Sequence, residues 1–424
     1  MKFIKSYFSI FFLLLLEQVQ AAFILVPMEA ETQQNHLKAY GITYWALDKS
    51  YKVSWLLNYR GGSFLLPDAP EIRKECQIRG VSFELLSDAA TNSILDEISS
   101  PSQNMETVVL EKAPKIAVYT PKGKQPWDDA VTMVLTYAEI PYTEIYDEEV
   151  LSDQLLLFDW LHLHHEDFTG QYGKFFGNYR NAPWYIQQKA DAEALAKKLG
   201  FTKVSEEKLA VAKKIRDFVI GGGFMFAMCS ATDSFDIALS AEGVDICEPM
   251  FDGDDSDANY QAQIDYSSTF AFKDYKLERQ PMVYEFSDID TTEEHGKGLF
   301  SMDKDYFTLM EYSAKWDPIP TMLCQNHTQL VKGFMGQTTA FATEKVKSNI
   351  LVMGECKING EARYIHGTKG KGMFTFYGGH DPEDYQHRVG DAPTVLDLHP
   401  NSPGYRLILN NVLFPAARKK KLKT

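Results

Sequence analysis

Long apolar runs are almost absent from this sequence. Beyond the first twenty residues, no segment reaches the roughly 18 consecutive apolar residues that a membrane-spanning helix needs, so we predict no transmembrane segment. The first residues combine Lys2 and Lys5 with an apolar run at 10–16 and a small-residue cleavage pattern that ends at Ala21. This combination is typical of a secretory signal peptide. We therefore predict that residues 1–21 are removed and that the protein is periplasmic or secreted.

Basic residues are also scarce. The sequence holds 43 Lys and Arg against 58 Asp and Glu, which gives a net charge of −15. A chain of this charge repels phosphates, so no nucleic acid partner is expected. The exception is the C-terminal segment 416–424, which we interpret as a solvated basic tail. Contact of this tail with an anionic partner of the cell envelope is the alternative.

Cysteines are few and widely spaced. The five are Cys76, Cys229, Cys247, Cys324 and Cys356. An odd number at such spacing predicts no disulfide framework, and it leaves at least one thiol unpaired. Cys229 is the candidate for a functional thiol, because it stands where an apolar run ends and a helical pattern begins.

The pattern along the chain divides it into regions. Residues 22–112 are rich in β-forming residues and predict a small N-terminal α+β domain. In 113–243 and 347–415, apolar strands, among them 155–163, alternate with helical patterns. This alternation predicts a doubly wound α/β fold with a mostly parallel sheet, as in flavodoxin. The alternation lapses in 244–346, which we interpret as a long insertion beside the site.

The stretch "GFMFAMCSATDSFD" places Cys229 at the carboxyl end of a predicted strand, directly before a helix. Ligands of parallel α/β sheets bind at these strand ends. A helix N-terminus stabilises a thiolate and lowers the pKa of the thiol. A tight strand-to-helix turn also presents its side chain outward, as in a nucleophile elbow. The alternative is a small buried residue that ends a strand.

A second strand end supplies a base. In "TFYGGHDPEDYQH", His380 follows the last predicted strand, and Asp381 and Glu383 come just after it. An imidazole can accept the thiol proton, and a carboxylate can orient that imidazole. Cys229, His380 and Glu383 or Asp381 therefore form a candidate catalytic triad.

These two motifs resemble those of the class I glutamine amidotransferases, whose elbow cysteine is followed late in the chain by His-Pro-Glu. The resemblance covers 115–243 and 348–414. It implies Cys229 as nucleophile, His380 as base and Glu383 as the carboxylate, displaced by the extra Asp381. The elbow here lacks the flanking glycines of that family. An oxyanion site would be formed by the backbone N–H of Ser230 together with that of Gly170 or Gly173, which lie in the loop after an earlier strand.

The whole chain also resembles a secreted Bacteroidetes family that carries the label "asparagine synthetase B". Glutamine-dependent asparagine synthetases expose an N-terminal cysteine and contain a Ser-Gly-Gly-x-Asp-Ser loop. This sequence has neither feature. We therefore do not predict synthetase activity.

Two further clusters are candidates for metal binding. His164, His165, Glu166 and Asp167 follow the strand predicted at 155–163, and imidazoles with carboxylates suit zinc or another divalent metal. Asp252, Asp254 and Asp257 offer carboxylates at a spacing that suits calcium. A polar loop is the alternative for the first cluster, and a solvated acidic loop for the second.

Three functions remain open at this stage. The first is a hydrolase that cleaves an amide or related acyl bond through the Cys-His-Glu triad, with no required cofactor. Its substrate would be a small molecule, a peptide or a glycan. The second is a metal-dependent hydrolase built on the cluster at 164–167 together with His380. The third is a binding or assembly module without catalysis.

Overall fold

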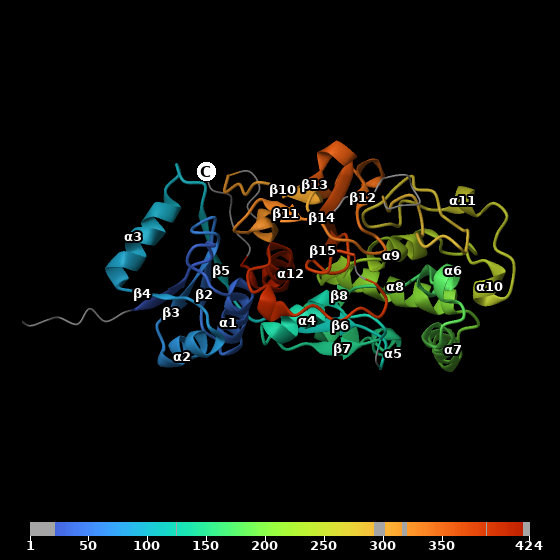
Figure 1. Ribbon diagram of the computed structural model, residues 1–424, viewed down its shortest axis with the longest axis horizontal. Coiled ribbons are helices and arrows are strands. Elements are labelled where there is room, and N and C mark those ends of the chain that lie inside the picture. The colour runs from blue at the N-terminus through green and yellow to red at the C-terminus, as the bar shows by residue number, and fades with distance from the viewer. Residues whose placement is uncertain (1–21, 124, 292–301, 316–319, 387, 419–424) are drawn as a thin grey trace, which may run out of the picture.

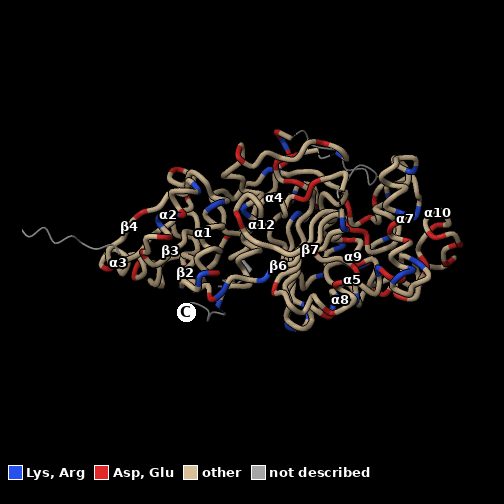
Figure 2. The backbone as a smooth tube through the Cα atoms, turned by 90° about the horizontal axis from the view of Figure 1, so that it is seen from below, with Lys and Arg blue, Asp and Glu red and all other residues tan. Residues whose placement is uncertain are grey.

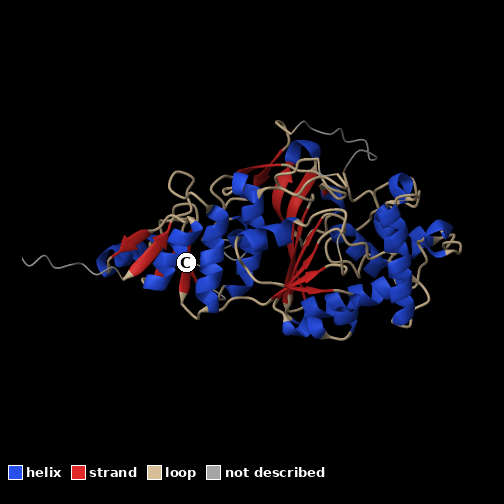
Figure 3. Cartoon of the chain, turned by 60° about the horizontal axis from the view of Figure 1, so that its bottom comes forward, coloured by secondary structure: helices blue, strands red, loops and turns tan. Residues whose placement is uncertain are grey.

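The computed structural model describes residues 22–123, 125–291, 302–315, 320–386 and 388–418 (Figure 1). The predicted signal peptide, 1–21, and most of the predicted basic tail lie outside these residues. The described chain has mixed α and β structure, with helices packed around two sheets (Figure 3). This confirms the α/β class in its general form. In the part described, no helix is both long enough and apolar enough to cross a membrane.

The N-terminal sheet is antiparallel, in the order β4-β1-β3-β2-β5. Its strands are β1 (Phe23–Val26), β2 (Val53–Leu57), β3 (Ser63–Pro67), β4 (Glu84–Leu86) and β5 (Glu106–Leu110). Successive side chains on a strand point to opposite faces. Leu25 therefore packs with α3 (Asp88–Ser99), while Ile24 and Val26 pack with α1 (His36–Asp48) and α2 (Pro70–Arg79).

The larger sheet has a parallel half, which carries the candidate site. Its neighbouring strands are β7 (Thr143–Ile145), β6 (Ile116–Tyr119), β8 (Trp160–Leu163), β9 (Phe224–Met228) and β15 (Gly372–Tyr377). Phe226 packs with α4 (Ala130–Tyr137) and α12 (Pro403–Leu413) on one face. Ala227 packs with α8 (Val204–Gly221) and α9 (Ala231–Ser240) on the other. The carboxyl ends of β8, β9 and β15 consequently lie together.

The other half of this sheet is antiparallel, which corrects the prediction of a mostly parallel sheet. Strand β15 pairs with β14 (Glu361–Lys369), and the sheet continues through β13 (Leu351–Cys356) and β10 (Tyr306–Leu309) to β11 (Leu330–Lys332). The cause is the connection from β14 to β15, in which only Gly370 and Lys371 separate a directly paired Lys369 and Gly372. A two-residue connection permits only an antiparallel hairpin.

Segment 244–346 contributes strands to this sheet. Both β10 and β11 belong to it, and so does β12 (Phe341–Ala342), which pairs with β14. Its short helices α10 (Pro249–Asp252) and α11 (Tyr260–Gln263) lie at the end of the molecule opposite the N-terminal sheet (Figure 1). Helices α6 (Phe176–Tyr179) and α7 (Pro183–Lys198) lie toward the same end, and α5 (Asp147–Leu151) lies beside β7 (Figure 1). Charged residues of both signs are spread over the whole length of the chain (Figure 2).

The two sheets are joined through a shared apolar core that includes α1, α4 and α12. Polar contacts cross the same boundary. The Tyr44 hydroxyl donates to the Pro114 carbonyl at 2.8 Å, and the buried Arg406 guanidinium on α12 donates to the Met28 carbonyl at 3.1 Å. Because these groups are buried, the contacts hold the N-terminal sheet against the helices of the larger one.

The predicted strand at 155–163 is shorter than expected. Residues Gln154–Leu157 form a 3-10 helix, and β8 begins only at Trp160. Leu156 and Leu157 are 72% and 65% exposed, so their apolar character does not reflect burial in the sheet. A short apolar run does not by itself distinguish a strand from another structure.

Candidate active site

Cys229 occupies a strained turn between β9 and α9. Its φ is +52°, in the left-handed region that side chains with a Cβ rarely adopt. Its backbone N–H donates to the Gly379 carbonyl at 3.1 Å, and the Ala231 N–H donates to the His164 carbonyl at 2.8 Å. The turn is thus fixed to the ends of both neighbouring strands. This is the backbone geometry of a nucleophile elbow.

His380 is brought to this thiol by the pairing of β15 with β9. The two strands are parallel, with Tyr377 opposite Met228, and His380 and Cys229 follow them. The His380 imidazole and the Cys229 thiol are hydrogen-bonded. Burial and the nearby His164 lower the pKa of His380, but the bonds with Asp128 and Cys229 outweigh them and raise it above the ordinary value. The protonated form of the His380 imidazole is therefore favoured.

The carboxylate beside His380 is Asp128, which sequence reasoning missed. His380 Nε2 lies 3.0 Å from the Asp128 carbonyl oxygen and 3.6 Å from its carboxylate. Asp128 follows β6 and precedes α4, whose first turn is capped by the Asp129 carboxylate. The sequence places an Asp-Asp pair after a strand, at the same edge of the sheet as Cys229. This position could have indicated that Asp128 belongs to the site. An Asp-Asp pair is, however, equally typical of the start of a helix.

The two predicted carboxylates have other partners, which corrects their assignment. Glu383 lies 3.1 Å from His399 Nδ1. Asp381 accepts hydrogen bonds from the Tyr405 and Thr394 hydroxyls, both at 2.7 Å. Both carboxylates therefore shape the turn after His380 and do not orient its ring.

Two more histidines lie beside the pair Cys229–His380. His164 and His165 follow β8, and their ring centroids are 4.2 Å and 5.8 Å from that of His380. One ring nitrogen from each of the three histidines can be chosen so that all lie within 4.8 Å of one another. Burial holds the pKa of His165 well below the ordinary value, so its ring is neutral. Sequence reasoning placed both histidines at this edge.

The other half of the predicted metal cluster points elsewhere. The Asp167 carboxylate accepts from the Thr169 N–H at 2.6 Å and the Gly173 N–H at 3.0 Å, and so stabilises its own loop. Glu166 lines a separate cavity with Lys208, and burial raises the pKa of its carboxyl to about 8. The prediction that 164–167 form a single ligand set is therefore corrected.

The two predicted oxyanion donors are also separated. Ser230 directly follows Cys229, and across the described residues its backbone N–H donates no hydrogen bond. Gly170 instead packs on the start of α8, where an added Cβ would lie 2.7 Å from the Ser205 nitrogen. It lines the cavity of Glu166, away from Cys229. Ser230 remains a candidate, and the assignment of Gly170 is corrected.

The predicted calcium ligands are occupied by an ammonium group. Lys203 Nζ lies 2.9 Å from Asp252 and 2.6 Å from Asp254. Asp257 accepts a hydrogen bond from the Asp245 N–H at 3.0 Å. Because Lys203 supplies the positive charge, the cluster does not have the character of a cation site, and the calcium prediction is corrected.

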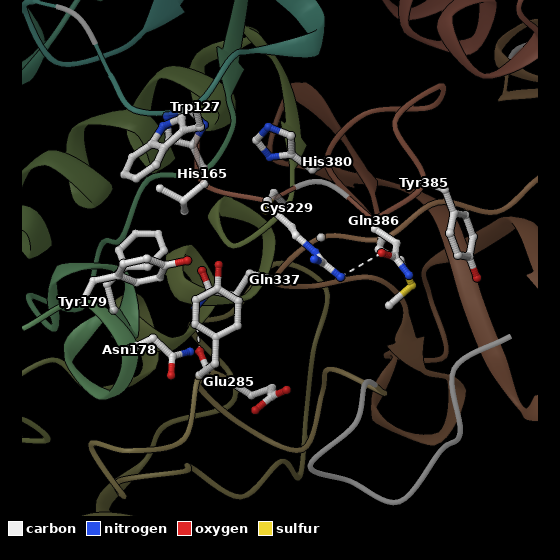
Figure 4. Close-up of a pocket in the computed structure, with 16 residues that line it drawn as sticks. Trp127, His165, Asn178, Tyr179, Cys229, Glu285, Gln337, His380, Tyr385 and Gln386 are labelled. Carbon is white, nitrogen blue, oxygen red and sulfur yellow. Dashed lines mark hydrogen bonds between the residues drawn. The ribbon is translucent and has the colours of Figure 1, made fainter. Parts of the chain in front are cut away.

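A cavity of about 360 Å³ opens over the thiol (Figure 4). Cys229, His380 and His165 line it together with Trp127. The remaining wall is mostly polar or aromatic and includes Asn178, Tyr179, Glu285, Gln337, Tyr385, Gln386 and Arg388. Glu285 and Gln337 come from segment 244–346, so this segment contributes to the site. A cavity lined by a thiol and by side chains of both charge signs suits a small polar ligand.

Comparison with known proteins identifies no family for this chain. No family model matches it, and no curated protein does. The similar solved structures include Cytoplasmic Protein STM3548 from Salmonella typhimurium, with 10% identity and a TM-score of 0.34, and Cytoplasmic Protein STM1381 from Salmonella typhimurium LT2, with 13% identity and a TM-score of 0.35. Each match covers 72% of this chain and 100% of the other.

The names of these two structures differ from the location predicted from the first residues. Both similar structures are named as cytoplasmic proteins, contrary to the periplasmic or secreted location expected from residues 1–21. We withdraw the prediction of export. Similarity at this level of identity and TM-score gives no information about the activity of this chain.

Proposed function

We propose that the protein is a cysteine-dependent hydrolase that cleaves an amide or related acyl bond, with Cys229 as nucleophile, His380 as acid and base, and Asp128 as the group that orients His380. The observation that carries the proposal is the hydrogen bond between His380 and a thiol held in a left-handed elbow. A strained nucleophile paired with an imidazole is costly for stability, and such strain is concentrated at functional sites.

The chemistry follows from these positions. The Cys229 thiolate attacks the substrate carbonyl carbon, and the carbonyl oxygen acquires the negative charge near the Ser230 N–H. The His380 imidazolium then gives its proton to the leaving nitrogen, the carbon–nitrogen bond breaks, and a thioester remains on Cys229. Water, losing a proton to His380, attacks the thioester. The acid product leaves and the thiol is restored.

The same proposal includes a fold of the class I glutamine amidotransferase type, doubly wound around the parallel half of the larger sheet. Its support is that helices cover both faces of β8 and β9, and that the thiol and the imidazole follow adjacent parallel strands. The substrate would be small and polar, since Arg388 and Glu285 line a cavity of about 360 Å³.

The test compares two cysteines in the native protein. Cys356 is the more accessible thiol and Cys229 is only 4% exposed, so accessibility alone predicts faster labelling of Cys356. Activation by His380 predicts the reverse. Iodoacetamide labelling followed by mass spectrometry should show Cys229 reacting first, and His380→Ala should abolish that preference. Faster labelling of Cys356 in the wild type would contradict the proposal.

A second measurement identifies the reaction. Ammonia release is followed over a panel of free amino-acid amides and peptide amides, and the acyl-enzyme is trapped by acid quench and weighed. Cys229→Ala should remove both signals. A non-catalytic binding module would instead show ligand-induced thermal stabilisation that Cys229→Ala leaves intact, with no ammonia from any amide.

A further inference from the structure

The three imidazoles at the site are packed more closely than the proposed hydrolysis requires. His164, His165 and His380 each offer a ring nitrogen, and these nitrogens lie within 4.8 Å of one another. Among the described residues, His164 Nε2 and both ring nitrogens of His165 are buried without hydrogen-bond partners. Buried polar atoms in proteins are nearly always satisfied, so this cluster calls for a ligand.

The surroundings of the cluster orient it as they would in a metal site. His164 Nδ1 lies 3.2 Å from the Asp129 carboxylate, which is itself fixed by capping α4. His380 Nε2 lies 3.0 Å from the Asp128 carbonyl. Metal-binding histidines commonly direct the second ring nitrogen to a carboxylate or carbonyl in this way. The opposite nitrogens, Nε2 of His164 and Nδ1 of His380, would then bind the metal, and the His380 ring would give up its bond to Cys229.

His165 completes the cluster on the side of the cavity. Its ring packs edge-on against Trp127, with the centroids 4.9 Å apart. It lines the cavity together with Cys229 and His380, so an ion can enter from there. Three imidazoles with one open position, neutral once His380 has lost its proton, form a ligand set that zinc favours.

We propose that His164, His165 and His380 bind a divalent transition metal, of which zinc fits best, and that the bound metal takes His380 away from Cys229 and so masks the thiol. On binding, His380 releases its dissociable proton to solvent and its nitrogen donates an electron pair to the metal. The metal forms no bond to Cys229, and no group changes its oxidation state. The metal site stands on the histidine cluster alone, whereas the masking effect rests on the proposed function.

The binding test uses the full chain, treated with a chelator that is then removed. Zinc chloride is titrated by calorimetry, and cobalt is followed by its visible spectrum. One equivalent of zinc should bind, and His165→Ala should weaken it at least tenfold. His399→Ala is the matched control, because this histidine pairs with Glu383 outside the cluster, and it should bind zinc as the wild type does. No zinc binding, or binding unchanged by His165→Ala, would overturn the site.

The masking test measures labelling of Cys229 by iodoacetamide with and without one equivalent of zinc. Zinc should slow labelling at least tenfold in the wild type, EDTA should restore it, and His165→Ala should respond far less. If metal-free Cys229 is already unreactive while zinc still binds, the proposed hydrolase fails and the metal site stands. If zinc-loaded Cys229→Ala hydrolyses amides, the metal activates water, and the masking role is overturned.

Discussion

His380 Nε2 lies 3.6 Å from the Asp128 carboxylate, although 252 residues separate the two positions in the sequence. The contact forms because Asp128 follows one parallel strand, β6, while His380 follows another, β15. Both segments leave the sheet at the same edge. In the proposed reaction this carboxylate stabilises the imidazolium that faces the Cys229 thiolate. Asp128 is therefore a positioning residue that acts through His380.

Replacing Asp128 should weaken the thiolate–imidazolium pair. We expect Asp128→Asn to slow iodoacetamide labelling of Cys229 by roughly tenfold or more, since each unit by which the pKa of His380 falls corresponds to a tenfold change in the protonation equilibrium. The pH dependence of the labelling rate, measured from pH 5 to 9, should also shift. A purely structural effect of the substitution would not produce this shift. Glu383→Gln is the control and should keep the wild-type profile. A shift with Glu383→Gln but not with Asp128→Asn would restore the triad expected from the sequence.

The elbow should be more stable with glycine at its centre. Cys229 has a φ of +52°, where glycine carries no Cβ penalty. We expect Cys229→Gly to have a free energy of unfolding about 1 kcal/mol above that of Cys229→Ala, measured by urea denaturation. Neither variant can be labelled at this position. In the adjacent strand, Ala227→Gly should instead lose stability. Equal stability of the two Cys229 variants would show that the turn is not strained.

The Asp233 carboxyl on α9 should make stability depend on pH. Burial raises its pKa from 3.8 to about 7, so the folded state holds a proton that the unfolded state releases. The stabilisation is therefore full below about pH 4 and is lost as the pH rises to about 7. Asp233→Asn keeps an oxygen acceptor for the Ser234 N–H and the Thr338 hydroxyl and should remove this dependence.

The measurement is the free energy of unfolding from urea titrations between pH 4 and 8. The difference between wild type and Asp233→Asn should change by a few kcal/mol across this range, in favour of the variant at high pH. Asp255→Asn, in an exposed loop, is the control and should run parallel to the wild type. Parallel curves for Asp233→Asn as well would contradict the prediction.

The buried pair Lys208–Asp147 should be costly to break. Lys208 Nζ lies 2.7 Å from the Asp147 carboxylate, and the two side chains are only 6% and 1% exposed. Removing the ammonium leaves a buried charge without its partner, so Lys208→Met should lower the free energy of unfolding by about 3–5 kcal/mol. The double variant with Asp147→Leu should recover much of the loss. The exposed pair Lys213–Glu242 supplies the control, since Lys213→Met should cost about 0–1 kcal/mol. A loss in the double variant as large as in Lys208→Met would argue against this account.

Local patterns in the sequence predicted several features of the fold. Period-two alternation indicated the N-terminal sheet, and the strand and helix around Cys229 followed from the residues on either side. The turn between β14 and β15 was also encoded locally, in Gly370 and Lys371, but its consequence for strand direction was overlooked. The predicted strand at 155–163 was too long because exposed leucines have the same apolar character as buried ones.

What the sequence by itself determined is the placement of Cys229, His380, His164 and His165 at strand ends, because each depends only on its near neighbours in the chain. The tertiary structure alone decided which charged groups meet. Asp128 reaches His380 across 252 residues, and Lys203 reaches Asp254 across 51. The physical reason is that a carboxylate interacts with whichever positive or donor group the fold brings within a few ångströms, and separation along the chain does not encode that distance.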